Sequence, residues 1–278
     1  MPAYMQSPDA AKRKPVTVPG LRQMKARGEK IVMLTCYDTS FAAQMEAAGV
    51  DVALVGDSLG NVVQGQTSTL PVTLDQMVYH ASLVARGLKA TLQIVDLPFM
   101  QFRDPATALA ASARLMAEGG AAMVKLEGGS EWTCEVIAAL TSRDVPVCAH
   151  LGLTPQSVHK MGGYRMQGKT DDAAAHLRAQ ALEVTQAGAE LLVLESVPAA
   201  LAAEITRELP IPTIGIGAGA DCDGQVLVCY DMLGITPGHR PKFSKDFLAD
   251  HGSVRAAFAA YADDVRAGRF PGPAQIAG

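Results

Sequence analysis

Acidic side chains close three successive apolar runs of the sequence, at positions where parallel strands would end. These residues are Asp57, Asp96 and Glu127. The carboxyl ends of parallel strands meet at one edge of a sheet or barrel, with neighbouring strands about 4.8 Å apart, so the three carboxylates should converge. Oxygen ligands without His or Cys at metal spacing favour a hard ion, which predicts Mg²⁺ bound by few carboxylates and several waters. The alternative for each acid is capping of the following helix.

Two further polar side chains lie beside these acids. Lys125 precedes Glu127 by two residues and therefore lies on the same face of its strand. A buried lysine needs a partner, which could be one of the acids or the carboxylate of an anionic substrate, and both interpretations can hold together. Ser58, next to Asp57, could donate a hydrogen bond to the same substrate, although a serine beside glycine is commonly a turn residue.

A fourth acid, Glu195, ends the apolar run 191–194 and is expected across the mouth from the other three. A carboxylate in a partly desolvated site gains basicity, so Glu195 is a candidate base for removing a proton next to a carbonyl. Pairing with His150, or capping of the helix after Pro198, is the alternative. His150 itself is either a packing histidine or an acid or base.

The elements that position these residues alternate between short β-branched runs and helical segments. This βαβ pattern with eight strands predicts an α/β fold, a single-domain (β/α)₈ TIM barrel, with a doubly wound open sheet as the alternative. We expect a flexible tail at 1–14, the barrel at 15–266 and a second tail at 267–278. The expected strands are 31–36, 52–55, 91–95, 122–126, 145–150, 190–194, 213–216 and 226–229. Helix starts are expected at Asp38 or Thr39, Thr73, Asp104, Ser130 and Pro198.

The connections carry their own signals. Residues 60–70 are expected to form a loop, and 242–266 a helical region. The segment 152–170 is too long for a plain connection and has the glycine content of a mobile lid. The glycine-rich run 215–219 lacks the spacing of a phosphate-binding motif, so a tight turn accounts for it.

The composition restricts the function classes. The chain has 278 residues, 49% of them hydrophobic, and a net charge of −4, so no basic field for nucleic acid is expected. The five cysteines form no close pair and are expected to be reduced thiols. Neither a membrane-spanning run nor a signal peptide is apparent, which predicts a cytoplasmic protein with no membrane partner.

Several motifs, in order over about residues 18–247, resemble the ketopantoate hydroxymethyltransferase family. They are VGDSLG (55–60), STLPVT (68–73), DLPFM (96–100), MVKLEGG (123–129), HLGLTPQS (150–157) and GIGAG (215–219). Two departures, at Cys36 and 236–239, touch no proposed ligand but leave the shape of the loop after the eighth strand open.

The resemblance implies a phosphoenolpyruvate/pyruvate-type barrel that transfers a hydroxymethyl group from 5,10-methylenetetrahydrofolate to 3-methyl-2-oxobutanoate. The product would be 2-dehydropantoate, on the route to pantothenate and coenzyme A, formed through a Mg²⁺-stabilised enolate. Carried over by motif, the metal residues would be Asp57, Asp96 and, through water, Glu127. Ser58 and Lys125 would bind the keto acid together with the two aspartates, and Glu195 would be the base. The resemblance also implies a homodecamer of two five-membered rings.

Other parts of the expected mechanism are less specific. Closing of the 152–170 loop would exclude water from the enolate, with His150 and Tyr164 as contributors. Arg165 and Lys169 are candidates for binding the glutamate of the folate. The rival interpretations are another Mg²⁺-dependent keto-acid lyase or aldolase, which needs no folate, and a silent barrel that only binds a keto acid or serves as a scaffold.

Overall fold

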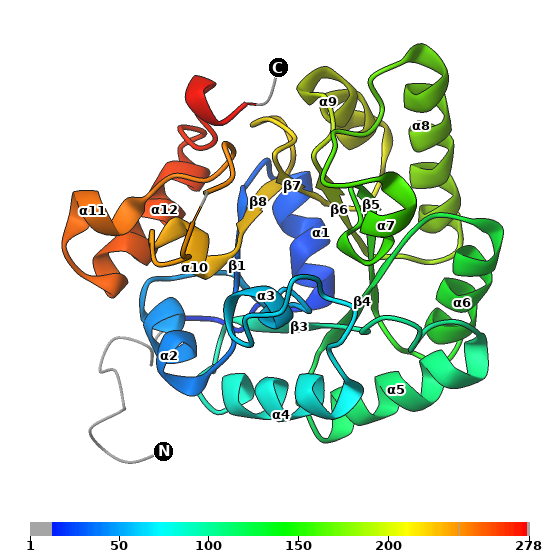
Figure 1. Cartoon of the computed structure of the whole chain (residues 1–278), viewed down its shortest axis with the longest axis horizontal. Coiled ribbons are helices and arrows are strands. Elements are labelled where there is room, and N and C mark those ends of the chain that lie inside the picture. Colours follow the sequence, from blue (N-terminus) through cyan, green and yellow to red (C-terminus); the bar gives the residue numbers. More distant parts are fainter. Residues whose placement is uncertain (1–12, 239, 277–278) are drawn as a thin grey trace.

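The computed structural model describes residues 13–238 and 240–276, in which eight parallel strands close into a barrel surrounded by helices (Figure 1). The strands follow chain order around the barrel, and β1 pairs with both β2 and β8. This closure confirms the (β/α)₈ prediction and excludes the open sheet. The strands are β1 (Ile31–Thr35), β2 (Val52–Val55), β3 (Leu92–Asp96), β4 (Met123–Glu127), β5 (Val147–Gly152), β6 (Leu191–Glu195), β7 (Thr213–Ile216) and β8 (Gly224–Leu227).

Helices precede the barrel, connect its strands and close the chain. They are α1 (Val18–Ala26), α2 (Thr39–Ala47), α3 (Leu59–Val62), α4 (Leu74–Ala85), α5 (Pro105–Ala117), α6 (Glu131–Thr141), α7 (Val158–Met161), α8 (Asp171–Gln186), α9 (Ala199–Glu208), α10 (Cys229–Met232), α11 (Phe247–His251) and α12 (Val254–Arg266). Predicted N-caps are confirmed at Asp38, Thr73 and Asp104, whose side chains accept from backbone N–H groups of the first turn. Ser130 occupies the N-cap of α6, but its hydroxyl contacts Thr133 Oγ1 instead of the backbone.

Some predicted boundaries were wrong. The expected loop 60–70 begins with the helical turn α3, in which Leu59 is fully buried. The expected helical region 242–266 is two helices, because Gly252 at φ 71° ends α11 and Ser253 caps α12. The eighth strand ends at Leu227 and not at Cys229, which begins α10.

The barrel has two apolar layers that follow the two-residue period of the strands. Ile31, Met33 and Val52 point into the barrel with the rest of one buried cluster, whereas Val32 and Leu34 pack against the helices in the other. Leu21 of α1 belongs to the inner cluster, so α1 closes the end of the barrel where the strands begin (Figure 1). The opposite end remains available for a site.

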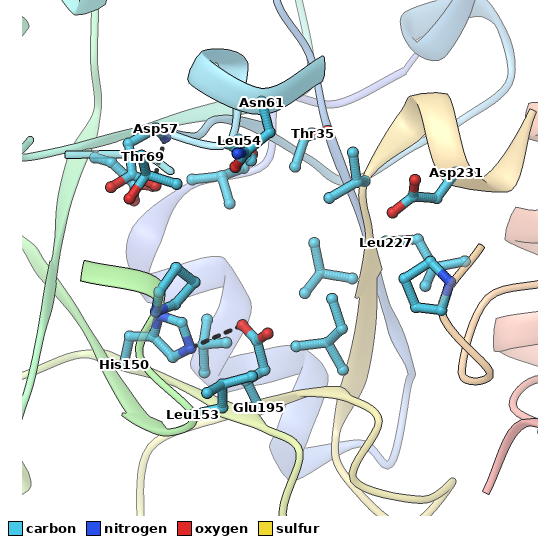
Figure 2. A pocket seen from close by; sticks show the side chains of 18 of the residues that line it. Thr35, Leu54, Asp57, Asn61, Thr69, His150, Leu153, Glu195, Leu227 and Asp231 are labelled. Carbon is cyan, nitrogen blue, oxygen red and sulfur yellow. Dashed lines mark hydrogen bonds and ion pairs between the residues drawn. The ribbon is translucent and has the colours of Figure 1, made fainter. Parts of the chain in front are cut away.

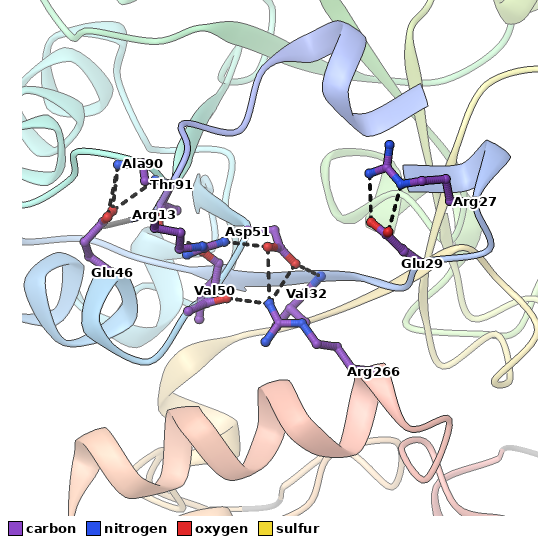
Figure 3. A network of polar contacts seen from close by, with 11 residues as sticks. Arg13, Arg27, Glu29, Val32, Glu46, Val50, Asp51, Ala90, Thr91 and Arg266 are labelled. Atoms are coloured by element: carbon purple, nitrogen blue, oxygen red, sulfur yellow. Dashed lines mark hydrogen bonds and ion pairs between the residues drawn. The ribbon is translucent and has the colours of Figure 1, made fainter. Parts of the chain in front are cut away.

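A polar network at the closed end ties distant segments together (Figure 3). Asp51 accepts hydrogen bonds from Val32 N, Arg13 and Arg266. Glu46 of α2 accepts from the backbone of the segment that leads into β3. Arg13 lies within the predicted N-terminal tail, of which residues 1–12 are outside the described residues. The packing also continues past Arg266 to the buried Phe270.

Two further sequence predictions concern the environment of the chain. All five cysteines are free, as predicted, and four of them are buried. Within the described ranges, no helix combines the length and apolarity needed to span a membrane.

Candidate active site

A cavity of about 590 Å³ opens where the barrel strands end. Strand ends and the loops that follow them form its walls. Figure 2 shows Asp57 on one side of this cavity and Glu195, next to His150, on another. All the residues that the sequence predicted for the site line it, namely Asp57, Ser58, Asp96, Lys125, Glu127 and Glu195.

The strand period explains why most of these side chains point inward. Met123 belongs to the inner apolar cluster, so Lys125 and Glu127, two and four residues later, face the barrel interior. Asp96 continues the inward series of β3 in the same way, and Glu195 continues that of β6. The apolar residues therefore fill the barrel below, while the last inward positions of β3, β4 and β6 present charges at the mouth.

Hydrogen bonds join the acids into one cluster. Lys125 Nζ donates to Asp96 Oδ1 over 2.7 Å, and the backbone N–H of Asp57 donates to Asp96 Oδ2 over 3.0 Å. Gln156 bridges the other two acids, because its Nε2 donates to Asp57 Oδ2 over 2.8 Å and its backbone N–H to Glu127 Oε2 over 2.9 Å. The sequence prediction that the acids of β2, β3 and β4 lie together is therefore correct in space.

The cluster concentrates negative charge in a buried place. Burial and the neighbouring carboxylates of Asp96 and Glu127 raise the pKa of Asp57 well above its usual value. Burial by itself lowers the pKa of Lys125, but the carboxylates of Asp96, Glu127 and Asp57 outweigh it and raise the pKa. Lys125 is thus a cation surrounded by acids, and the cluster still favours additional positive charge.

Whether these acids suit Mg²⁺ depends on donor type and spacing. Across residues 13–238 and 240–276, no three His, Cys, Asp or Glu side chains are spaced to bind a metal together. Mg²⁺ usually takes one or two protein carboxylates and completes its shell with water and substrate oxygens. Asp57 and Asp96, linked by a hydrogen bond, fit that requirement, and Glu127 would contribute through water. The donor set therefore suits Mg²⁺, and the metal site stays a prediction.

His150 links the acid cluster to Glu195. Its Nδ1 lies 3.5 Å from Glu127 Oε1 and its Nε2 lies 3.2 Å from Glu195 Oε2, although neither contact has hydrogen-bond angles. Burial and the charge of Lys125 lower the pKa of His150, but the two glutamates outweigh them and raise it to about 9. A protonated His150 would place its positive charge beside Glu195 at the cavity wall. The pairing of Glu195 with His150, considered from the sequence, is confirmed.

Ser58 is oriented by a residue that the sequence analysis missed. Its Oγ lies 2.9 Å from the Oη of the buried Tyr37. Gly56 is required nearby, because a Cβ there would come within 2.9 Å of Ser58 Oγ. The hydroxyl of Ser58 is therefore set in position beside Asp57 at the cavity wall.

The expected lid segment 152–170 contains a short 3₁₀ turn, Pro155–Ser157, followed by α7. The turn carries Gln156 into the acid cluster, which makes its first part a wall of the site. Tyr164 lines the cavity while remaining 61% exposed. Arg165 and Lys169 are exposed and do not line the cavity. Movement of this segment remains a prediction.

Among the polar residues at the site, Tyr37, Gln156 and Asp231 were not identified from the sequence. Gln156 lies in the motif 150–157, but nothing in its neighbourhood indicated contact with Asp57, 99 positions earlier, or with Glu127, 29 positions earlier. Asp231 lines the cavity from α10, beyond the predicted end of the last strand. The tight turn expected at 215–219 is present, with positive φ at Gly217 and Gly219.

Solved structures place this barrel in a class. The chain is similar to phosphoenolpyruvate phosphomutase from Streptomyces platensis subsp. rosaceus, at 14% identity and a TM-score of 0.60, over 78% of this chain and 83% of that one. It is also similar to 2,3-dimethylmalate lyase, a PEP mutase/isocitrate lyase superfamily member, at 17% identity and a TM-score of 0.57, over 79% and 80% of the chains. A phosphonopyruvate hydrolase complex with oxalate and Mg²⁺ matches at 15% identity and a TM-score of 0.59, over 94% and 91%. The fold that this chain shares with these proteins is the closed (β/α)₈ barrel.

Sequence relatives specify the family within that class. The family model described as ketopantoate hydroxymethyltransferase matches residues 15–273. Relatives called 3-methyl-2-oxobutanoate hydroxymethyltransferase share 58% identity in Burkholderia thailandensis and 56% in Ralstonia nicotianae, over 97% and 98% of this chain and 98% of each relative. The chain belongs to the ketopantoate hydroxymethyltransferase family. It is thus a transferase with the activity of that family, which belongs to pantothenate biosynthesis.

Proposed function

We propose that the chain transfers a hydroxymethyl group from 5,10-methylenetetrahydrofolate to 3-methyl-2-oxobutanoate and forms 2-dehydropantoate, with Mg²⁺ at Asp57, Asp96 and Glu127. One observation carries this proposal: Asp57, which belongs to the acid cluster, and Glu195, which pairs with His150, line different sides of one cavity. The site therefore offers separate places for binding a keto acid and for removing its proton. The phosphonopyruvate hydrolase complex with oxalate and Mg²⁺ agrees with such chemistry on this fold.

The substrate carboxylate is bound by Lys125 and Ser58. Lys125 is a buried cation with acids on one side and the cavity on the other. An anionic ligand in the cavity can therefore pair with its ammonium group in addition to the acids, without displacing water from an exposed charge. With Tyr37 Oη as the donor in its pair with Ser58 Oγ, the single hydrogen of the Ser58 hydroxyl is donated to the substrate carboxylate. When bound, Mg²⁺ supplies Lewis-acid polarisation of the keto oxygen.

The C3 proton moves to the carboxylate of Glu195. His150 Nε2 lies 3.2 Å from one oxygen of this carboxylate and forms an ion pair with it when protonated. General-base catalysis at such a position contributes about 10²- to 10⁴-fold to the rate. The C3 carbon then forms a bond to the one-carbon carbon while the bonds from that carbon to the two folate nitrogens break. Water supplies the hydroxyl oxygen, and the C3 proton and one proton of water leave on the two nitrogens of tetrahydrofolate.

Deuterium exchange at C3 of 3-methyl-2-oxobutanoate, followed by NMR, tests the proposal. Exchange should require Mg²⁺, and 2-dehydropantoate should form only after 5,10-methylenetetrahydrofolate is added. Exchange without product would indicate a keto-acid lyase or aldolase instead. Absence of both would indicate a barrel that only binds the keto acid.

We also propose a homodecamer of two five-membered rings. Analytical ultracentrifugation should give a ten-subunit species, and a monomer or dimer at micromolar concentration would contradict it.

A further inference from the structure

The cavity extends well beyond the residues assigned to the keto acid. From Glu195 it continues past the ends of β7 and β8 to the segment 229–243, and a five-carbon keto acid fills only a part of about 590 Å³. The wall of this second part is mainly apolar, with side chains from Ile216, Val226, Leu227 and Phe243. This space can therefore take a flat, largely apolar second ligand beside the keto acid.

Phe243 forms a rigid side of this space. It packs over Gly217, where a Cβ would lie 3.0 Å from the Phe243 ring, and Gly217 has a φ of 61° that favours glycine. Phe243 also contacts both apolar clusters of the barrel. The ring is thus fixed against the end of β7, where it can stack on a flat ligand.

Asp231 is the polar group of this apolar region. It lies on α10, is only 7% exposed and lines the cavity, and Figure 2 shows it on the side away from Asp57 and His150. Thr236 Oγ1 donates to its Oδ1 over 2.6 Å, which fixes the carboxylate. Among the described residues, none donates a hydrogen bond to Asp231 Oδ2 or forms an ion pair with the carboxylate. Arg240 pairs instead with Asp246.

We infer that Asp231 recognises the pteridine ring of the folate by accepting hydrogen bonds from its N3–H and 2-amino group. This inference rests on the proposed folate co-substrate. These two donors lie side by side, as in an amidine, and match the two oxygens of a carboxylate. Oδ1 can accept a second hydrogen bond in addition to the one from Thr236, because a carboxylate oxygen has two lone pairs. The bicycle then lies along the apolar wall and Phe243, which places its one-carbon unit toward Glu195 and the keto acid.

The electrostatics of Asp231 agree with this role. Burial raises its pKa, while the hydroxyl of Thr236 and the more distant charge of Arg240 act in the opposite direction. A carboxylate that is largely removed from water gains from a ligand that returns two donors to it. A ligand without those donors leaves the group unpaired, which is how a polar site discriminates strongly between analogues.

The experiment uses the isosteric variant Asp231→Asn. Its amide NH₂ is a hydrogen-bond donor and replaces a carboxylate oxygen that would accept from the ligand. Binding of tetrahydrofolate and of its 2-desamino-2-methyl analogue is measured by calorimetry, together with steady-state kinetics. For the wild-type protein, the analogue should bind at least about ten-fold more weakly. In Asp231→Asn this preference should shrink toward equality. Its KM for 5,10-methylenetetrahydrofolate should rise at least about ten-fold, well beyond any change in the KM for the keto acid.

Two further variants separate recognition from a structural role. Thr236→Val removes the hydrogen bond that orients Asp231, so it should weaken both folates while keeping part of the preference. Asp221→Asn, which removes one negative charge from an exposed position that does not line the cavity, should leave the preference unchanged. An equal loss for both folates in Asp231→Asn, or an unchanged preference, would overturn the inference.

A failure of the proposed function would give a different set of results from a failure of this inference. If the wild-type protein bound tetrahydrofolate and discriminated against the analogue through Asp231 but formed no 2-dehydropantoate, the reaction would be wrong and the recognition would stand. If the wild-type protein bound neither folate, both would be refuted.

Discussion

Replacing Lys125 with methionine should destabilise the protein strongly in the absence of metal. The ammonium lies 2.7 Å from Asp96, and the two side chains are only 5% and 4% exposed. Removing one partner of a buried pair leaves an uncompensated charge, which costs about 3–5 kcal/mol. Burial and the carboxylates of Asp96 and Glu127 raise the pKa of Asp57, which shows that the cluster already disfavours further negative charge while Lys125 is present.

The cost can be read as a fall in melting temperature. For a domain of this size, about 1 kcal/mol corresponds to roughly 2–4 °C, so Lys125→Met should melt about 6 °C or more below the wild type. Calorimetry in buffer with a chelator, at one fixed protein concentration, is the assay, because ligands and assembly shift apparent stability.

The double variant Lys125→Met, Asp96→Asn is the matched control. Removing both partners of a buried pair is far less costly than removing one, so the double variant should regain more than half of the lost stability. A fall of less than about 2 °C in the single variant would refute the electrostatic argument. So would a double variant that melts no higher than the single one.

Three further predictions follow from individual side chains. Glu195→Gln should slow C3 proton exchange by about 10²- to 10⁴-fold while keto-acid affinity, measured by calorimetry, changes little, and unchanged exchange would remove the residue from the role of base. Asp57→Asn should weaken Mg²⁺ binding in a titration of the protein with the ion, whereas wild-type affinity would contradict the metal site. Burial alone would raise the pKa of Glu46, but N–H donors of Thr91 and its neighbours outweigh it and lower the pKa. Glu46→Gln should therefore cost about 1.5–3 kcal/mol at pH 7. Because the folded pKa is lowered, the ionised Glu46 stabilises the folded protein above the unfolded pKa of about 4.3, and this stabilisation is lost as pH falls through the folded pKa. The difference in free energy of unfolding between the variant and the wild type should therefore vanish at low pH. A difference that stays constant with pH would contradict this account.

The barrel and the acid cluster could be predicted from the sequence because both depend on short-range patterns. Eight β-branched runs separated by helical segments indicate parallel strands, and a parallel arrangement collects the carboxyl ends of all strands on one side. The two-residue period then relates Lys125 to Glu127 without knowledge of the neighbouring strands. The helix starts at Thr73 and Asp104 were equally local, since an N-cap acts within one turn.

Turns without a strong local signal were missed. The helical turn at Leu59–Val62 is stabilised by burial of Leu59 between the barrel and its helices, whereas its sequence is typical of a loop. The break at Gly252 was overlooked because the helical pattern continues on both sides of it. These elements are decided by what they pack against, which the local pattern does not contain.

Contacts between distant strands were decided only by the tertiary structure. Gln156 reaches Asp57 across 99 positions of sequence, and its place depends on the 3₁₀ turn after β5. Pairing of His150 with Glu195 was an alternative considered from the sequence, but the second contact, with Glu127, follows from the register of β4 and β5, in which positions 127 and 150 are paired. Asp231 enters the cavity only because β8 ends two residues earlier than its sequence suggests. The sequence by itself determined which residues of a strand share its inward face, since that depends on the periodicity of each strand. Strand register and loop packing determined which of them meet, because these arise from the closure of the whole barrel.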